Sequence, residues 1–218
     1  MFFTRFSFNP RRRDSRRVLQ SPHVLHAAVM ASFPDASPTP EGRVLWRLDN
    51  TVHGATLYIV SPRQPDLTHL AEQAGWPTIP DSWVARSYDS LLSKIERGQR
   101  YRFRITANPV RSERQRDGSR GKPFGHVTVA QQEKWLLDRS DAAGFRIDEA
   151  AEGGAQFAVT DQKTLRFTRR ETQVTLRTAT YEGMLTVTDP DALCATLCHG
   201  LGRAKGYGCG LLTLAPAR

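Results

Sequence analysis

The stretch RVLWRLDNTVHGATLYIVS, residues 43–61, predicts two β-strands on either side of the turn NTVHG. A strand at 2–8 and a helix that ends before Pro34 precede it in the sequence. A helix at 66–75 and a strand within 83–88 follow it. The order β-α-β-β-α-β predicts a ferredoxin-like fold, in which a four-stranded antiparallel sheet carries two helices on one face.

The first expected helix has a clear start signal. Ser21 is a favoured N-cap residue, and Pro22 suits the first helical position because its missing N–H is not needed there. The helix is therefore predicted to begin at this pair. The basic run RRRDSRR at 11–17 is predicted as a loop between the first strand and this helix.

The second half of the chain repeats the order of elements without repeating the residues. The pattern predicts, in order, a strand at 100–109, a helix at 128–144, a strand-rich middle, a helix at 189–200 and a last strand at 210–216. The chain is thus predicted as an α+β protein with tandem ferredoxin-like (βαββαβ) domains and antiparallel sheets. We expect a first domain at 1–90, a linker at 91–100 and a second domain at 101–218.

Composition narrows the partners and the compartment. The 218 residues carry a formal net charge of +9, which favours a polyanion: nucleic acid first, an anionic membrane surface second. No apolar run approaches the roughly 18 residues of a membrane span, and the N-terminus lacks the order of a secretory signal. Three cysteines do not form a disulfide framework. We expect a cytoplasmic protein that does not enter a membrane.

Two histidines of the first helix, His23 and His26, form a candidate catalytic pair. At positions i and i+3 they share one helix face, about 5–6 Å apart at Cβ. A neutral imidazole can take or give a proton near neutral pH, so such a pair can act as base and acid on RNA, whose 2′-OH supplies the nucleophile. The alternative is that both are ordinary helix residues.

The stretch HGLGRAKGYGCG at 199–210 carries five glycines between a helix and a strand. It is neither a Walker loop nor a Rossmann turn, because both of those lead from a strand into a helix. Glycines at this density let the backbone approach either an RNA backbone or the other domain closely, and Arg203 and Lys205 add positive charge. A helix C-cap followed by a tight turn explains at most two of the five.

The cysteines lie close to this stretch and raise the question of a metal site. Cys194, Cys198 and Cys209 with His199 do not have the paired spacing of a zinc site. Small buried hydrophobic residues explain these cysteines better. We expect no metal and no cofactor.

Two segments are rich in basic residues. Residues 110–126 are predicted as a mobile basic loop, which either is solvated or orders on phosphate binding. Residues 163–177, KTLRFTRRETQVTLR, predict a basic hairpin, and a two-stranded basic ribbon can lie along an RNA stem. The alternative is a solvated sheet edge whose charges discourage aggregation.

Three segments together resemble a known family. They are the start of the chain through SPHVLH, the strand YRFRITANP at 101–109 and the tail YEGMLTVTDPDALCATLCHGLGRAKGYGCGLLTLAP at 181–216. The chain resembles the CasE family, the CRISPR-associated endoribonuclease of the type I-E Cascade complex. The glycine-loop signature G-x-G-x-A-K-x-x-G-x-G-L-L-x-L-A-P at 200–216 is the most specific part of this resemblance.

The resemblance implies a fold, a reaction and site residues. The family has tandem ferredoxin-like domains, cleaves the repeat hairpin of precursor crRNA without metal, and generally stays bound beside the other Cascade subunits. The histidine of its Tyr-x-x-His motif matches His26, whereas His23 stands in place of the tyrosine. His26 is therefore the principal catalytic candidate, with His23 assisting. The candidate RNA-binding residues are Arg102, Arg104, Lys163, Arg166, Arg169, Arg170, Arg203 and Lys205.

The expected reaction is attack of a 2′-OH that leaves a 2′,3′-cyclic phosphate and a 5′-OH. A rival interpretation is a non-catalytic RNA-hairpin-binding subunit of a ribonucleoprotein, which the missing tyrosine keeps open. The fold does not choose between the two, because ferredoxin-like domains serve many functions.

Overall fold

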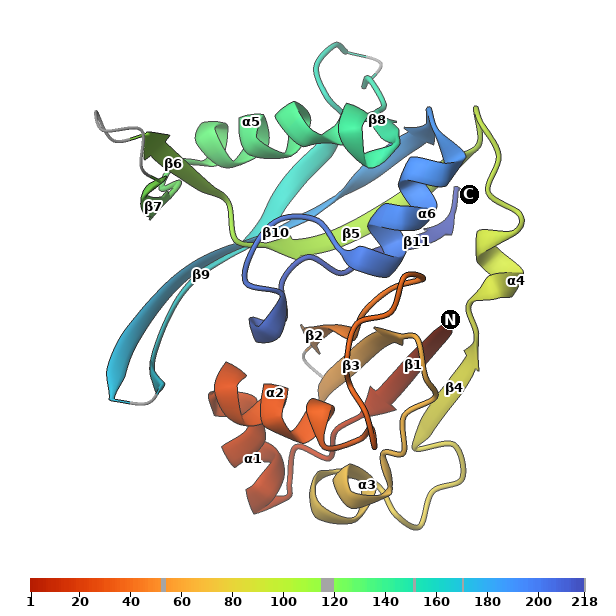
Figure 1. The fold of residues 1–218 in the computed structure, drawn as a ribbon, viewed down its shortest axis with the longest axis vertical. Coiled ribbons are helices and arrows are strands. Elements are labelled where there is room, and N and C mark those ends of the chain that lie inside the picture. Colours follow the sequence, from red (N-terminus) through yellow and green to blue (C-terminus); the bar gives the residue numbers. More distant parts are fainter. Residues whose placement is uncertain (52–53, 115–119, 151, 170, 218) are drawn as a thin grey trace.

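The computed structural model describes residues 1–51, 54–114, 120–150, 152–169 and 171–217. Its strands form one antiparallel sheet in each half of the chain, and helices pack on both sheets (Figure 1). The predicted α+β class and the tandem ferredoxin-like fold are thus confirmed. Within these ranges, no helix is long and apolar enough to cross a membrane.

The first sheet has the strand order of a ferredoxin-like fold. Its strands β1 (Phe2–Ser7), β2 (Leu45–Thr51), β3 (Gly54–Ser61) and β4 (Trp83–Ser87) are arranged as β2-β3-β1-β4. β1 pairs antiparallel with β3 on one side and with β4 on the other. The sheet therefore ends at β2, an edge strand, and we call this part of the chain the first unit.

The helices of the first unit follow the predicted signals with one correction. In α2 (Pro22–Met30) the Ser21 hydroxyl accepts a hydrogen bond from the Val24 N–H, which confirms the predicted N-cap. α3 (Thr68–Ala74) ends at Gly75 as expected. The basic run at 11–17 was expected as a loop, and this is wrong, because most of it lies in α1 (Arg13–Gln20).

α1 forms because two of its residues are buried one turn apart. Ser15 donates its hydroxyl to the Ala74 carbonyl at 2.6 Å, and Val18 is in the core. These residues are at i and i+3, so they share the face that packs on the unit. The arginines between them point to solvent, and Arg17 forms an i,i+3 pair with Asp14.

The second sheet has the same strand order. Its path β11-β5-β10-β8 is built from β5 (Arg100–Ala107), β8 (Phe145–Ile147), β10 (Thr172–Val187) and β11 (Leu212–Pro216). The helices of this second unit are α5 (Val129–Ser140) and α6 (Pro190–His199), with a 3-10 turn η1 at Asp141–Ala143 and another, η2, at Lys205–Tyr207.

Two hairpins extend from the second unit. The strand β9 (Phe157–Arg169) pairs with β10 beyond the edge of the sheet, so the predicted basic hairpin is confirmed (Figure 1). The strands β6 (Val110–Arg114) and β7 (Arg120–Gly125) pair with each other. The expected loop at 110–126 is therefore wrong for its described residues, since pairing satisfies backbone groups that a loop leaves open. In the sequence, Asp117-Gly118 is a dipeptide typical of hairpins that the prediction did not use, and it lies outside the described residues.

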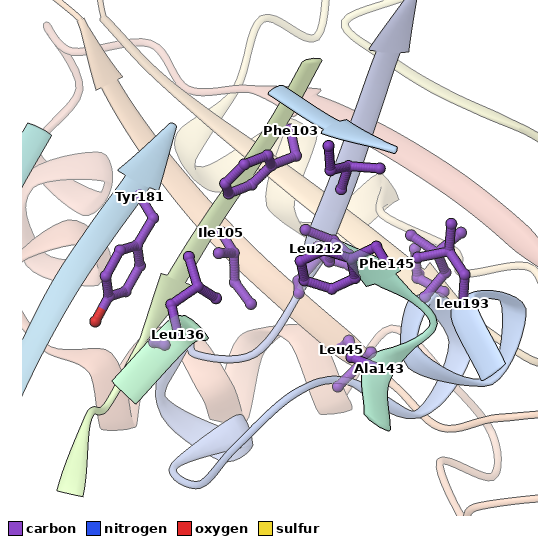
Figure 2. Packing of buried hydrophobic residues seen from close by; sticks show 14 of the residues in the cluster. Leu45, Phe103, Ile105, Leu136, Ala143, Phe145, Tyr181, Leu193 and Leu212 are labelled. Atoms are coloured by element: carbon purple, nitrogen blue, oxygen red, sulfur yellow. The ribbon is translucent and has the colours of Figure 1, made fainter. Parts of the chain in front are cut away.

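The first sheet is apolar on both faces, and this fixes where the two units meet. Phe6, Trp46 and Leu57 belong to the cluster under the first unit's helices. Leu45 and Val60, of opposite parity, belong to the core of the second unit. Figure 2 shows Leu45 in that core together with residues of the second sheet and its helices. The two units thus share one continuous core.

The connection between the units contains α4 (Asp89–Leu92), and the N-terminal ammonium group is paired with Asp89 at 2.9 Å. Ile95, further along, is buried in the core of the second unit. The linker at 91–100 and the domain bounds around it stay predictions.

We expect Gly144→Ala to destabilise the protein by about 3 kcal/mol or more, because it combines backbone strain with a clash. Gly144 has φ +85°, and a Cβ would lie 2.3 Å from the Leu193 nitrogen. Gly153→Ala is the control, with φ +89° and nothing within 4 Å, and it should cost about 1–2 kcal/mol. Urea unfolding measures both, and equal losses would contradict the packing of η1 on α6.

Candidate active site

A buried arginine of the first unit fixes that unit to the second sheet. Arg47 in β2 is only 3% exposed, and it donates two hydrogen bonds to Asp49, at 2.7 and 3.0 Å. Its Nη1 also donates to the carbonyl oxygens of Arg104 and Leu211 and to the Thr213 hydroxyl. These acceptors belong to β5, to β11 and to the residue before β11. The Arg47 side chain therefore sets how β2 lies against the second unit.

His26 lies near this contact, on α2 beside the edge strand β2. Its Nδ1 accepts a hydrogen bond from the Trp46 Nε1–H at 3.4 Å. Because an indole nitrogen only donates, a neutral His26 in this position carries its proton on Nε2. At 3.4 Å this hydrogen bond is long and therefore weak. It orients the ring but favours this tautomer only slightly.

The glycine-rich loop of the second unit, residues 200–210, passes beside β2 and contacts α2. A Cβ on Gly206 would lie 3.4 Å from His26 Nε2, and one on Gly208 would lie 2.6 Å from the Trp46 ring. Gly208 has φ +80°, which also favours glycine. The close approach of this loop to the other domain, one of two alternatives from the sequence, is thus observed. His26 Nε2 therefore faces the backbone of Gly206, a residue that has no side chain.

His23 occupies a different position from His26. It lies in the first turn of α2 and is exposed. In the described part of the chain its side chain has no hydrogen bond or ion pair. The structure thus places His26, and not His23, against the glycine loop, and the assisting role of His23 stays a prediction.

Two cations without a carboxylate partner lie at the glycine loop. Lys205 is half-buried; burial lowers its pKa, and the nearby Arg43 cation lowers it further. The Arg43 Nε is buried and has no hydrogen-bond partner among the described residues. Among the described residues, neither the Lys205 nor the Arg43 side chain forms an ion pair with a carboxylate. An anion that bound beside Lys205 would supply the missing charge.

The basic hairpin reaches the same loop through an aromatic contact. Phe167 in β9 packs on Tyr207 of η2 with ring centroids 4.8 Å apart. Lys163 lies on the same face of β9, where it pairs with Asp161 at 2.5 Å. Arg166 lies on the opposite face and is exposed. The side chain of Arg169 and the whole of Arg170 lie outside the described residues.

The remaining basic candidates lie either where the two units meet, which we call the seam, or on the surface. Arg104 in β5 is half-buried and pairs with Asp49 at 3.5 Å and with Glu182 at 3.2 Å. Arg102, on the same face two residues away, is exposed. Arg203 is exposed and borders a separate hollow beside α5. Among the candidates whose side chains are described, Arg104, Lys163 and Lys205 therefore lie close to the region between the units.

Cys198 and Cys209 are buried in the protein interior, and Cys194 is half-buried. Burial raises the pKa of Cys198 to about 11 and that of Cys209 to about 12, so both thiols stay protonated at neutral pH. No group of three or more potential metal ligands lies together among the described residues. The described cysteines thus behave as small hydrophobic residues.

Three residues of this region were missed by the sequence analysis. In the sequence, nothing distinguishes Arg47 from other charged residues in strands, or Trp46 from other core residues. Tyr207 had a signal, since it is the one aromatic residue in a glycine-rich run. Each of the three has a partner 20 or more residues away in the chain. Arg47 donates to the Arg104 carbonyl in β5, Trp46 donates to His26, and Tyr207 packs on Phe167.

Two ferredoxin-like units with a shared core, and a histidine and a half-buried lysine where they meet, define a tandem ferredoxin-like protein with an interdomain site. A family model described as CRISPR associated protein matches residues 1–216. The chain therefore belongs to this family of CRISPR-associated proteins, in its CasE group.

Two relatives are similar over nearly the whole chain. The CRISPR-associated endoribonuclease Cse3 of Thermus thermophilus is 29% identical, over 99% of this chain and 100% of its own length. The CRISPR system Cascade subunit CasE of Escherichia coli K12 is 28% identical, over 89% and 92%.

A solved structure of Thermus thermophilus Cse3, bound to an RNA representing a pre-cleavage complex, has a TM-score of 0.80. It is 29% identical and covers 99% of this chain and 98% of its own. The crystal structure of Cas6e from Escherichia coli K-12, with a TM-score of 0.66 at 21% identity over both full chains, shares the fold.

We expect Arg47→Ala to lower the free energy of unfolding by about 3–5 kcal/mol, because it leaves Asp49 buried without its main partner. Arg102→Ala, which removes an exposed arginine of β5, is the control and should change stability by less than about 0.5 kcal/mol. Urea unfolding compares the two. Equal small effects would mean that Arg47 does not hold the units together.

Proposed function

We propose that this protein is an endoribonuclease that processes precursor CRISPR RNA. The observation that carries the proposal is the position of His26, whose Nε2 faces the uncovered backbone of Gly206 at the seam between the units. Lys205, the residue next to Gly206, adds a half-buried cation. The name of the Thermus relative, an endoribonuclease, and its structure with a pre-cleavage RNA support the same function.

The proposed substrate is the hairpin of the CRISPR repeat. The hairpin β9–β10 extends away from the second sheet, toward the side of the first unit (Figure 1). It contacts the glycine loop through Phe167 and Tyr207. A stem bound along this ribbon would bring its base toward His26. The protein then stays with its product as a Cascade subunit, in line with the name of the Escherichia coli relative.

The proposed reaction needs two proton transfers and no metal ion. The 2′-oxygen attacks the adjacent phosphorus as a base removes its proton, and the bond from phosphorus to the 5′-oxygen breaks as an acid protonates that oxygen. The products are a 2′,3′-cyclic phosphate and a 5′-OH. Lys205 and Arg43 would stabilise the negative charge that builds on the phosphoryl oxygens.

His26 is the principal proton-transfer group, and His23 assists it from the preceding turn of α2. Trp46 orients the His26 ring through Nδ1, and Nε2 is the nitrogen directed at the glycine loop. His23 replaces the tyrosine of the family motif, and its exposed imidazole can reach a bound RNA without rearrangement of the protein. Which of the two acts as base is left open by their positions.

The stem and its flanks would be bound by Lys163, Arg166, Arg169, Arg170, Arg102, Arg104, Arg203 and Lys205. The rival function, a hairpin-binding subunit without catalysis, uses the same cations. It differs only in that His26 would have no chemical role.

We expect His26→Ala to lower the cleavage rate of a repeat hairpin by about 10²–10⁴ with little change in affinity, because it removes a proton-transfer group. His69→Ala is a matched control, since His69 lies on α3 and its ring forms a hydrogen bond with the Ala28 carbonyl. A substrate with 2′-deoxyribose at the scissile nucleotide should bind but not be cut. Cleavage of that substrate would contradict attack by the 2′-OH.

We expect His23→Ala to lower the single-turnover rate substantially while binding and thermal stability stay unchanged, because His23 is exposed and bonds to no other described residue. His23→Tyr, which restores the residue of the family motif, should keep more activity than His23→Ala. Wild-type cleavage by His23→Ala would remove this residue from the site.

We expect hairpin affinity to fall steeply with salt, because phosphate contacts release counterions. Arg166→Ala should reduce the slope of log K against log salt by about 0.7–0.9, the effect of one lost phosphate contact. Arg63→Ala is the control, since Arg63 is paired with Asp35 in the first unit. A slope unchanged by Arg166→Ala would place Arg166 away from the RNA.

A further inference from the structure

A cleft of about 320 Å³ lies between the two units, beside the edge strand β2. One wall comes from α1, α2 and β2 of the first unit. The other comes from the face of β5 and β10 that carries Arg104, Thr106 and Thr178, and from β9. This face of the second sheet points away from the core residues Phe103 and Ile105. The cleft therefore lies outside the core of the second unit and opens between the units.

Part of the cleft wall is apolar. Leu48, Leu165 and the aromatic Tyr207 contribute partly exposed side chains to it, and the buried Leu25 and Trp46 lie at its base. Such surfaces bind the faces of planar rings, and every nucleobase has such a face. The volume of the cleft is also at the low end of the range for small-molecule sites, which suits one base and not a stem.

The rest of the wall can form hydrogen bonds. Gln20 and Asn50 supply exposed amides, and Asp161 and Lys163 supply an acceptor and donors from their ion pair. The edge of a base carries both donors and acceptors, so a mixed rim of this kind fits it better than a purely apolar ligand.

The cleft adjoins the proposed site of cleavage. Leu25 in its wall precedes His26 in α2, and Trp46 in its wall donates to the His26 ring. Tyr207 in its wall follows Gly206, which faces His26 Nε2. A nucleotide whose phosphate lies at His26 can therefore place its base in the cleft.

We propose that this cleft binds one unpaired nucleobase of the RNA, from a nucleotide that flanks the scissile phosphodiester. The inference rests on the proposed function and adds a base-binding subsite to it. A stacked helical strand holds the 2′-oxygen out of line with the bond to the 5′-oxygen. Removing one flanking base from the stack turns that nucleotide, so its sugar and phosphate can adopt the in-line geometry that the reaction needs.

The test is a double-mutant cycle on affinity. Repeat hairpins with 2′-deoxyribose at the scissile nucleotide are made with either an intact base or an abasic site at each flanking nucleotide in turn. Each is bound to the wild type, to Leu165→Trp, which fills the cleft, and to Leu137→Trp, at an exposed position of α5, as control. Asn50→Trp, at an exposed position of the rim, fills the cleft independently if Leu165→Trp does not fold.

For the wild type and Leu137→Trp, one of the two abasic sites should weaken binding about 5- to 150-fold, the loss expected for one base stacked on an aromatic ring. For Leu165→Trp, or for Asn50→Trp, the intact hairpin should bind more weakly and the abasic site should cost nothing further. Losses that multiply, or no loss from either abasic site, would overturn the subsite while hairpin binding and cleavage leave the proposed function standing. Absence of hairpin binding by the wild type would overturn both.

Discussion

The buried guanidinium of Arg47 is the contact on which the arrangement of the two units depends. The guanidinium donates hydrogen bonds to the Asp49 carboxylate within β2. It also donates to the Arg104 and Leu211 carbonyls of the second unit. A charged group this deeply buried is stable only while all these partners are present. The relative position of the two sheets is therefore restricted to the one geometry that satisfies it.

That geometry brings together side chains that neither unit could combine alone. α2 of the first unit supplies His26, and the glycine loop of the second supplies Gly206 and the neighbouring Lys205. Glycine at 208 lets the loop come against Trp46, which in turn orients His26. The candidate site, the adjoining cleft and the basic hairpin that joins the loop through Phe167 and Tyr207 thus all depend on the seam.

The sequence predicted those parts of the molecule that local patterns specify. Ser21 and Gly75 mark the helix ends that the structure has, and strand alternation led to both ferredoxin-like units. Charge misled the prediction at 11–17, where the spacing of Ser15 and Val18 outweighs the arginines. The contacts of Arg47, Trp46 and Tyr207 join distant segments, so no local pattern contains them. His26 was found through a motif, but its surroundings were not.

The central claim is that residues at this seam cut RNA by acid–base chemistry alone. Its most direct test is to identify both new ends of a repeat hairpin cut by the wild-type protein in excess EDTA, by mass spectrometry. The account predicts undiminished cleavage that leaves a 2′,3′-cyclic phosphate and a 5′-OH. Cleavage that stops in EDTA, or that leaves a 3′-OH and a 5′-phosphate, would contradict it.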